Sequence, residues 1–321
     1  MTSKNGGEHD LLGANDLARR TVLKATGGAA ALSVGTGSVA GAVDGGSGVE
    51  QVGTAGVKNV VDPVFGFAAM GPNPCAGTDG TDCLGAFPEP IRPSARVDMH
   101  IGIPEVLFAV AEAGGLPNET TAAINEAVAD GSLTGDDLPD GGTQVGGEQV
   151  SVTAVAEALV DTVGFHFDPA GLRVEPGDIV LFNAETPDHA VAAFHQRHGR
   201  QNRVPAGVGP LSAPLVPVGG FWLAQFDTEG VYDLYCPPHG VFGMVMRVVV
   251  WDGDGSVPQL DVGPPGRPPE EENALPSIVG GLDPNVPSSA AALESQTLSP
   301  ENVVDQGTVD WEAVVTEHRT A

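Results

Sequence analysis

Residues Tyr232–Met246 read YDLYCPPHGVFGMVM and hold several kinds of side chain that are scarce in the rest of the chain. Within this stretch, Cys236, His239 and Met244 form the pattern C-x2-H-x4-M between two segments with strand-like alternation. A thiolate, an imidazole nitrogen and a thioether are soft ligands, which suit copper, especially Cu(I), better than hard cations. The stretch therefore predicts three ligands of one copper ion on a loop that joins two strands.

A further ligand has to come from another part of the chain. Blue electron-transfer copper is held by a Cys-His-His plane with a weak axial Met, so the loop requires a second histidine. His189 is the candidate, because it follows the strand-like segment DIVLFN and a turn, and begins the segment HAVAAF. We expect the strands between His189 and Cys236 to return the chain to the same end of a sheet.

The hydrophobic pattern changes to a period of two residues at Val163 and continues to Trp251. Pro-Ala-Gly and Pro-Gly-Asp turns divide this region into short segments, as expected for antiparallel strands. Short strands at close spacing favour a β-sandwich. The sequence therefore predicts a mainly β domain over residues 162–252.

The same region resembles a known family. YDLYCPPHGVFGMV is similar to the copper loop of plastocyanin-type cupredoxins, and FDPAGLRVEPGDIVLFNAETPDHAV is similar to their first half and to the small blue-copper group called halocyanins. The resemblance covers residues 162–252. It implies a cupredoxin-type Greek-key β-sandwich that holds one type 1 copper ion.

The resemblance also implies roles for individual residues. His189, Cys236 and His239 match the equatorial copper ligands, and Met244 matches the axial ligand. Tyr235, which precedes the ligand cysteine, matches an aromatic residue near an electron route in the family.

One position beside the site departs from the family pattern. Ala190 stands where these proteins often have Asn or Ser, whose side chain helps to fix the site. We therefore expect this contact to be missing on the His189 side.

The N-terminal residues 1–43 resemble an export signal. Arg19 and Arg20 precede a weakly apolar run rich in Ala and Gly, as in twin-arginine (Tat) signals. This run is too rich in small residues for a stable transmembrane helix, and we expect no transmembrane segment in the mature chain. The protein is accordingly predicted to be exported through the cytoplasmic membrane and soluble, on the extracellular or cell-surface side.

Residues 44–161 divide into two predicted parts. Residues 44–98 are rich in Gly, Pro and Asp and predict an irregular linker or arm. Residues 99–161 predict a small helical module, since start and stop signals mark helices that begin near Pro104, Asn118 and Ser151.

The C-terminal residues 253–321 predict an acidic, Pro-rich tail. The segment SPENVVDQGTVDWEAVV favours one terminal helix within it, with Ser299 as the cap and Pro300 at the first position.

Two cysteines outside the copper loop flank a turn-rich segment, CAGTDGTDC. In an oxidising exterior, Cys75 and Cys83 are expected to form a disulfide. A metal site is the alternative for this pair, although no histidine lies nearby in the sequence. Cys236 then stays unpaired, which agrees with its role as a metal ligand.

The charge of the chain excludes some partners. With 14 basic and 42 acidic side chains, the net charge of −28 would repel phosphates, so we expect no nucleic-acid partner. Such a lysine-poor, acidic composition is typical of halophilic proteins, which stay soluble in concentrated salt. The densest basic cluster is HQRHGRQNR, from His195 to Arg203. It is a docking patch, a set of accessory metal contacts near the copper end, or a solvated loop, and we favour the loop.

Together these features predict an exported mononuclear blue-copper electron carrier that cycles between Cu(II) and Cu(I) and serves redox partner proteins. A copper carrier or sensor is the alternative, followed by a subunit or domain of a copper-dependent reductase or oxidase. A self-contained multicopper enzyme is not expected, because the chain has one Cys-His-Met loop and only eight histidines. The oligomeric state stays open.

Overall fold

The computed structural model describes residues 61–129, 138–264 and 266–321. The Tat-like segment over 1–43 and the first part of the predicted linker, residues 44–60, lie outside the described residues. Among the residues that are described, no helix is long and apolar enough to cross a membrane.

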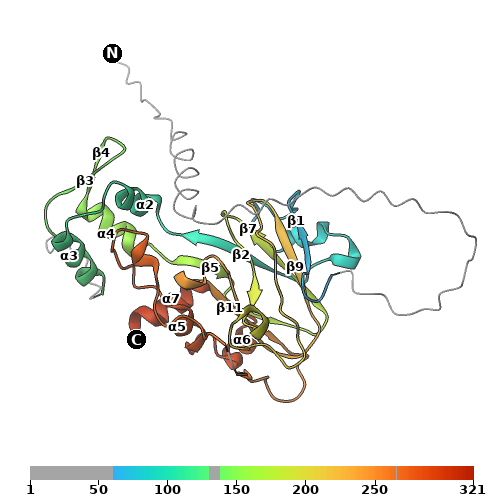
Figure 1. The fold of residues 1–321 in the computed structure, drawn as a ribbon. Helices are drawn as coiled ribbons and strands as arrows, with labels where there is room; N and C mark the ends of the chain where they lie inside the picture. The colour runs from blue at the N-terminus through green and yellow to red at the C-terminus, as the bar shows by residue number, and fades with distance from the viewer. Residues whose placement is uncertain (1–60, 130–137, 265) are drawn as a thin grey trace, which may run out of the picture. The chain divides into compact units, whose positions relative to one another are not determined.

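Two five-stranded sheets carry the described part of the fold (Figure 1). The first sheet has the order β1-β9-β7-β2-β5, with strands β1 (Phe67–Ala69), β9 (Phe221–Phe226), β7 (Asp178–Ala184), β2 (Ala95–Gly102) and β5 (Gly164–Asp168). The second has the order β12-β6-β11-β10-β8, with strands β12 (Thr308–Val309), β6 (Gly171–Val174), β11 (Val245–Val250), β10 (Gly230–Tyr235) and β8 (Ala192–Ala193).

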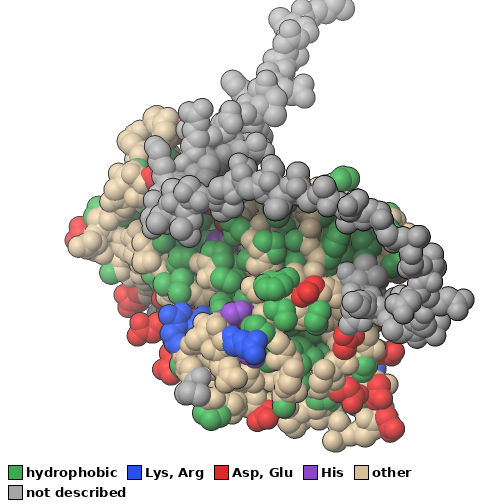
Figure 2. Space-filling view, turned by 45° about the vertical axis from the view of Figure 1, so that its right-hand side comes forward, with side chains coloured by type: hydrophobic (Ala, Val, Ile, Leu, Met, Phe, Trp, Pro, Cys, Tyr) green, Lys and Arg blue, Asp and Glu red, His purple; other side chains and the backbone are tan. Residues whose placement is uncertain are grey.

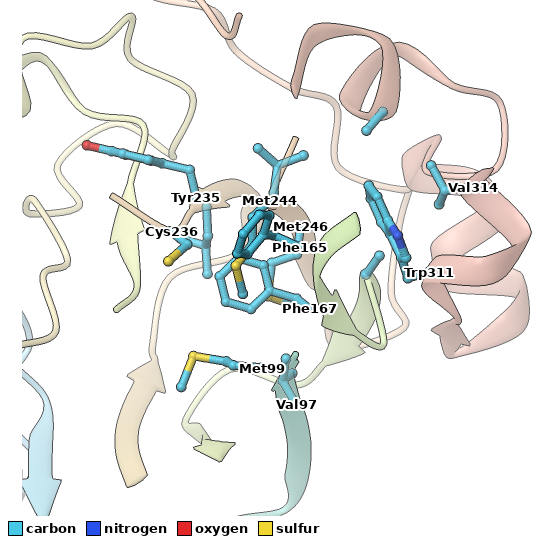
Figure 3. Close-up of a cluster of buried hydrophobic side chains, with 14 of the residues drawn as sticks. Val97, Met99, Phe165, Phe167, Tyr235, Cys236, Met244, Met246, Trp311 and Val314 are labelled. Atoms are coloured by element: carbon cyan, nitrogen blue, oxygen red, sulfur yellow. The ribbon is translucent and has the colours of Figure 1, made fainter. Parts of the chain in front are cut away.

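Buried side chains from both sheets form one hydrophobic cluster, as the core of a β-sandwich requires. Phe167 and Phe182 of the first sheet belong to it together with Tyr232 and Met246 of the second, and Figure 3 shows part of this cluster. The pairs β2–β7 and β6–β11 are parallel, whereas the other pairs within these two sheets are antiparallel. The mainly β sandwich predicted from the alternating pattern is confirmed.

The predicted irregular linker over 44–98 is wrong at two places in its described part, where the chain forms strands. β1 pairs with the edge of β9, and β2 lies inside the first sheet between β7 and β5. Val97 and Met99 are fully buried in the core, while Arg96 and Asp98 form an ion pair, at 2.7 Å between Nε and Oδ1. β2 forms because the sandwich buries its alternate apolar side chains. The prediction missed it because so short an alternation is hard to recognise beside Gly- and Pro-rich sequence.

Cys75 and Cys83 are joined by a disulfide in the structure. Two short 3-10 helices lie in this segment: η1 (Asp82–Ala86), which includes Cys83, and η2 (Glu89–Ile91). The guanidinium of Arg96 donates hydrogen bonds to the carbonyl oxygens of Thr78 at 2.6 Å and Gly80 at 2.9 Å. These contacts hold the disulfide loop against the first sheet.

Three helices lie where start and stop signals predict them in residues 99–161: α2 (Glu105–Glu112), α3 (Asn118–Ala129) and α4 (Val152–Val160). The Oγ of Ser151 accepts a hydrogen bond from the Ala154 amide at 3.1 Å and so caps α4. The prediction missed a two-stranded hairpin between α3 and α4, formed by β3 (Gly142–Val145) and β4 (Glu148–Ser151).

The predicted tail over 253–321 is also wrong, because much of this segment is packed. It contains η5 (Leu275–Ser277), α5 (Ser289–Glu294), α6 (Pro300–Gln306), β12 and α7 (Trp311–Thr320). In Figure 1 the orange and red segment lies beside β5 and β11. Trp311 is buried and its Nε1 donates to the Val163 carbonyl at 2.7 Å, so burial against the sandwich orders the segment.

The single terminal helix that the sequence favours is divided into α6 and α7. The Oγ of Ser299 caps α6 as predicted, accepting from the Asn302 amide at 3.4 Å. Gly307 then adopts a φ of 78°, which ends the helix, and the chain adds β12 to the edge of β6 before α7 begins.

Candidate metal centre

The predicted copper loop connects the adjacent strands β10 and β11 of the second sheet. Cys236 directly follows β10, and the loop makes one 3-10 turn, η4 (Gly240–Phe242), before β11. The Cys236 amide donates to the Met244 carbonyl at 3.1 Å, and the Met244 amide donates to the His239 carbonyl at 3.2 Å. These bonds close the loop, so all three predicted ligands from it lie at one end of the sandwich.

His189 reaches the same place from the segment between β7 and β8. Its carbonyl oxygen accepts a hydrogen bond from the Val216 amide at 2.7 Å, which anchors the segment. The Ala190 amide donates to the Sγ of Cys236 at 3.5 Å, so the two parts of the site are in direct contact.

Three ligating atoms converge in this arrangement. The Sγ of Cys236 lies 3.9 Å from His189 Nδ1 and 3.6 Å from His239 Nδ1, and the two Nδ1 atoms are 3.3 Å apart. All three side chains are buried, with at most 4% of any residue's surface exposed. Within the described ranges, no other three His, Cys, Asp or Glu side chains bring their ligand atoms this close together.

Neighbouring side chains orient the two imidazole rings. The Oγ1 of Thr186 is hydrogen-bonded to His189 Nε2 at 2.8 Å, which leaves Nδ1 to face the cysteine sulfur. The ring of Phe165 stacks on His239, with centroids 4.2 Å apart and an interplanar angle of 23°. Sequence reasoning missed both residues, since their roles depend on contacts across the sandwich.

Met244 is fully buried in the same hydrophobic cluster as Cys236 (Figure 3). Its backbone contact with Cys236 holds it at the same end of the sandwich, and its role as an axial ligand stays a prediction. Met246 is also fully buried in the cluster, as a core residue.

Burial sets the protonation of the site without a metal. It raises the pKa of the Cys236 thiol to about 12 and lowers the pKa of His239 to about 4. Burial, and then repulsion from His239, lowers the pKa of His189 to about 2. At neutral pH both imidazoles are thus neutral, which is the form that binds metals, whereas the thiol has to release a proton when a metal binds.

The donor set fits a soft or borderline cation. Two neutral imidazole nitrogens and one thiolate sulfur are the equatorial ligands typical of blue copper, and they are unsuited to Ca²⁺ or Mg²⁺, which take oxygen ligands. The negative charge of nearby Asp188 repels the Cys236 thiolate and so raises the pKa of the Cys236 thiol. The residues present therefore fit a single copper ion.

Tyr235, predicted to lie near an electron route, is the last residue of β10 and is 8% exposed. Its ring lies against Phe194, with centroids 4.7 Å apart, and under the guanidinium of Arg200, also at 4.7 Å. Arg200 in turn forms two hydrogen bonds with the Glu270 carboxylate, at 2.9 and 3.1 Å. The tyrosine is thus enclosed between an aromatic ring and a paired cation.

The expectation of a solvated loop is wrong for three residues of the basic cluster, since His195, with 6% of its surface exposed, is buried as well as two arginines. Arg200 and Arg203 are only 5% and 7% exposed, and each pairs with a carboxylate, Glu270 and Asp233 respectively. Arg197 is exposed, as predicted. Each arginine is buried together with a carboxylate partner that is distant in the sequence, so the local charge pattern could not predict this burial.

Comparisons with known proteins concern the region that contains this site. A sequence model described as copper binding proteins, plastocyanin/azurin family, matches residues 154–251. Pseudoazurin from Methylorubrum extorquens is 38% identical over 88 residues, which make up 27% of this chain and 52% of that protein. Chloroplastic plastocyanin from Tetradesmus obliquus is 32% identical over 122 residues, which make up 34% of this chain and 77% of that protein.

Among solved structures, that of pseudoazurin from Methylobacterium extorquens AM1 is 34% identical, with a TM-score of 0.24, and the match covers 28% of this chain and 65% of that chain. The chain thus spans about half the length of the first curated relative and about three quarters of the second.

Proposed function

Since the chain belongs to the plastocyanin/azurin family of copper-binding proteins, we propose that it is an exported mononuclear blue-copper electron carrier. The observation that carries the proposal is the convergence of His189 Nδ1, Cys236 Sγ and His239 Nδ1 in a buried group. In the proposed site these three residues are the equatorial ligands and Met244 is the axial ligand. When bound, copper supplies a one-electron change between Cu(II) and Cu(I).

The residues around the ligands favour electron transfer over catalysis. Catalytic metal sites keep a coordination position open to substrate, whereas these ligand side chains are almost completely shielded. The loop hydrogen bonds and the Thr186–His189 contact hold the donors in place whichever oxidation state is present. Fixed donors keep the structural change small when an electron is gained or lost.

Redox partner proteins are the proposed electron donor and acceptor, and Tyr235 is proposed to lie on the route to one of them. Apolar side chains suited to contact with another protein are exposed near His189. Leu215 and Val218, 54% and 57% exposed, flank Val216, whose amide bonds the His189 carbonyl. Figure 2 shows hydrophobic side chains gathered on one face with acidic side chains toward its edge. Export is proposed from the Tat-like segment.

Copper loading tests the proposal directly. We expect the purified protein to take up one Cu(II) and to develop an intense blue absorption band and an EPR signal. Both should disappear on addition of one electron per protein and return on reoxidation. A protein that retains only Cu(I) and stays colourless would instead favour the copper carrier or sensor.

Met244→Gln is expected to retain copper but to change its reduction potential, because the weak axial ligand tunes the potential of such sites. A tenfold change in the relative affinity for Cu(II) and Cu(I) corresponds to about 59 mV for one electron, and we expect a shift of at least this order. Redox titration followed by the blue band measures it.

A pair of matched variants separates the axial role from packing. Met244→Leu should also shift the potential, whereas Met246→Leu, at an equally buried methionine two residues away, should not. Equal potentials in the wild type and all three variants would rule out Met244 as a ligand.

A further inference from the structure

The C-terminal segment, residues 270–290, lies against the copper loop. It is outside the region that matches the family, which ends at residue 251. Gly240, Val241 and Phe242, the three residues that follow His239, each accept a hydrogen bond from this segment through their backbone carbonyl. The chain between the His239 and Met244 ligands is therefore held from outside the sandwich.

Two side chains supply the outer bonds of this set. The Oγ of Ser289 donates to the Gly240 carbonyl at 2.6 Å, and both groups are buried. The Nδ2 of Asn273 donates to the Phe242 carbonyl at 3.1 Å and to the Pro287 carbonyl at 2.9 Å. Between them, the backbone amide of Ala274 donates to the Val241 carbonyl at 2.9 Å.

The donors are themselves held in position. The Ala290 amide donates to the Glu270 carbonyl at 2.8 Å, which ties the two ends of the segment together. The Oδ1 of Asn273 accepts from the Leu275 amide at 2.8 Å, and the Leu275 side chain is fully buried in the main core. Glu270 also holds Arg200 over Tyr235, so the segment is linked to the residue that precedes Cys236 as well.

The fit between the segment and the loop is close at Gly243. This residue has a φ of 91°, and a Cβ there would lie 2.4 Å from the Pro287 carbonyl oxygen. Only glycine allows both the conformation and the approach. The loop sequence is thus adapted to the C-terminal segment as well as to the ligands.

We propose that Asn273 and Ser289 are positioning residues of the copper centre: they fix the backbone between His239 and Met244 and so hold these two ligands relative to Cys236 and His189. Ala190, next to the His189 ligand, has a side chain that cannot form a hydrogen bond, whereas Asn273 and Ser289 tether the loop through theirs. The proposal rests on the proposed function, because positioning matters for a metal that has to keep its geometry.

Two substitutions remove the tethers with little change in volume. Asn273→Asp keeps the oxygen that accepts from the Leu275 amide but replaces the donor to Phe242 with a second oxygen. Ser289→Ala removes the donor to Gly240. The matched controls are Asn302→Asp, since Asn302 donates to the Thr297 carbonyl at 2.7 Å, and Ser277→Ala, since Ser277 donates to the Ala274 carbonyl at 2.6 Å. Neither control residue bonds the copper loop.

Amide hydrogen exchange in the copper-free protein measures the loop independently of the metal. The amides of Phe242, Gly243 and Met244 all donate within the loop. Asn273→Asp and Ser289→Ala each remove a hydrogen bond to a loop carbonyl, and we expect the exchange of these three loop amides to become about tenfold faster. The exchange of strand amides in β9 and β11 should not change. The controls should exchange as the wild type does.

The copper-loaded variants give the second measurement. In Asn273→Asp and Ser289→Ala, the reduction potential and the EPR spectrum should both differ from those of the wild type and the controls. Unchanged loop exchange, an equal acceleration throughout the sandwich, or a loosened loop with an unchanged potential and spectrum would each overturn the proposal. Failure of every variant and the wild type to take up copper would contradict the proposed function, while the exchange data would still show whether the segment holds the loop.

Discussion

Cys236→Ala is expected to abolish the blue absorption band of the copper-loaded protein completely. Cys236 is the only cysteine in the chain outside the disulfide, and its thiolate is the only anionic sulfur available to the site. The equatorial ligands would be reduced to two imidazoles, which do not make a blue site. Visible and EPR spectra of the loaded variant, beside far-UV circular dichroism to confirm folding, measure the loss.

Proton release provides an independent measurement for the same variant. The metal-free thiol of Cys236 has a pKa of about 12 and is protonated at pH 7. Copper binding should therefore release about one proton in the wild type and none in Cys236→Ala, as a titration in weak buffer would show.

The matched control removes the other two cysteines. The double variant Cys75→Ala, Cys83→Ala loses the disulfide but should keep the blue band, because both residues lie in the segment held by Arg96 and take no part in the site. A blue band that survives Cys236→Ala, or that disappears only in the double variant, would show that the ligand assignment is wrong.

Asp233→Asn is expected to destabilise the copper-free protein by about 3–5 kcal/mol, because it leaves two buried cations without their counter-ion. Asp233 is fully buried on β10. Its carboxylate accepts from Arg203 Nε at 2.7 Å, from Arg247 Nε at 2.8 Å and from Arg247 Nη2 at 3.0 Å. Both arginines are less than 10% exposed, so water cannot replace the lost partner. Chemical denaturation of the copper-free protein measures the free energy of unfolding.

An exposed ion pair serves as the control for this variant. Glu89 and Arg92 pair on the surface, with side chains 81% and 40% exposed. Glu89→Gln should change the free energy of unfolding by less than about 1 kcal/mol. An effect of Asp233→Asn within that small range would mean that the buried arginines do not depend on its charge.

Much of the site could be predicted from the sequence because its signals are local. Cys236, His239 and Met244 lie within one short loop, and the loop is bounded by strands whose alternation is visible in the sequence. His189 was more difficult, since it comes from another part of the chain, but its position after a strand and a turn was informative. The structure brings His189, Cys236 and His239 together as that reasoning expects.

The helices of residues 99–161 could also be predicted, since a cap such as Ser151 or a stop such as Gly114 acts on backbone groups within a few residues of itself. The strand β2 could not, because its short alternation gains meaning only when Val97 and Met99 meet the core of a sandwich formed by later residues.

The amino-acid sequence alone was enough for three local features of this protein: which residues could ligate copper, where the helices of residues 99–161 begin, and the large negative charge of the chain. The packing of residues 253–321, the burial of Arg200 and Arg203, and the hydrogen bonds from Asn273 and Ser289 to the loop between His239 and Met244 became visible only in the folded protein. The physical reason is that a cap, a turn or a ligand spacing is set by neighbours along the chain. Burial and pairing, by contrast, depend on side chains that are distant in sequence and meet only when the chain folds.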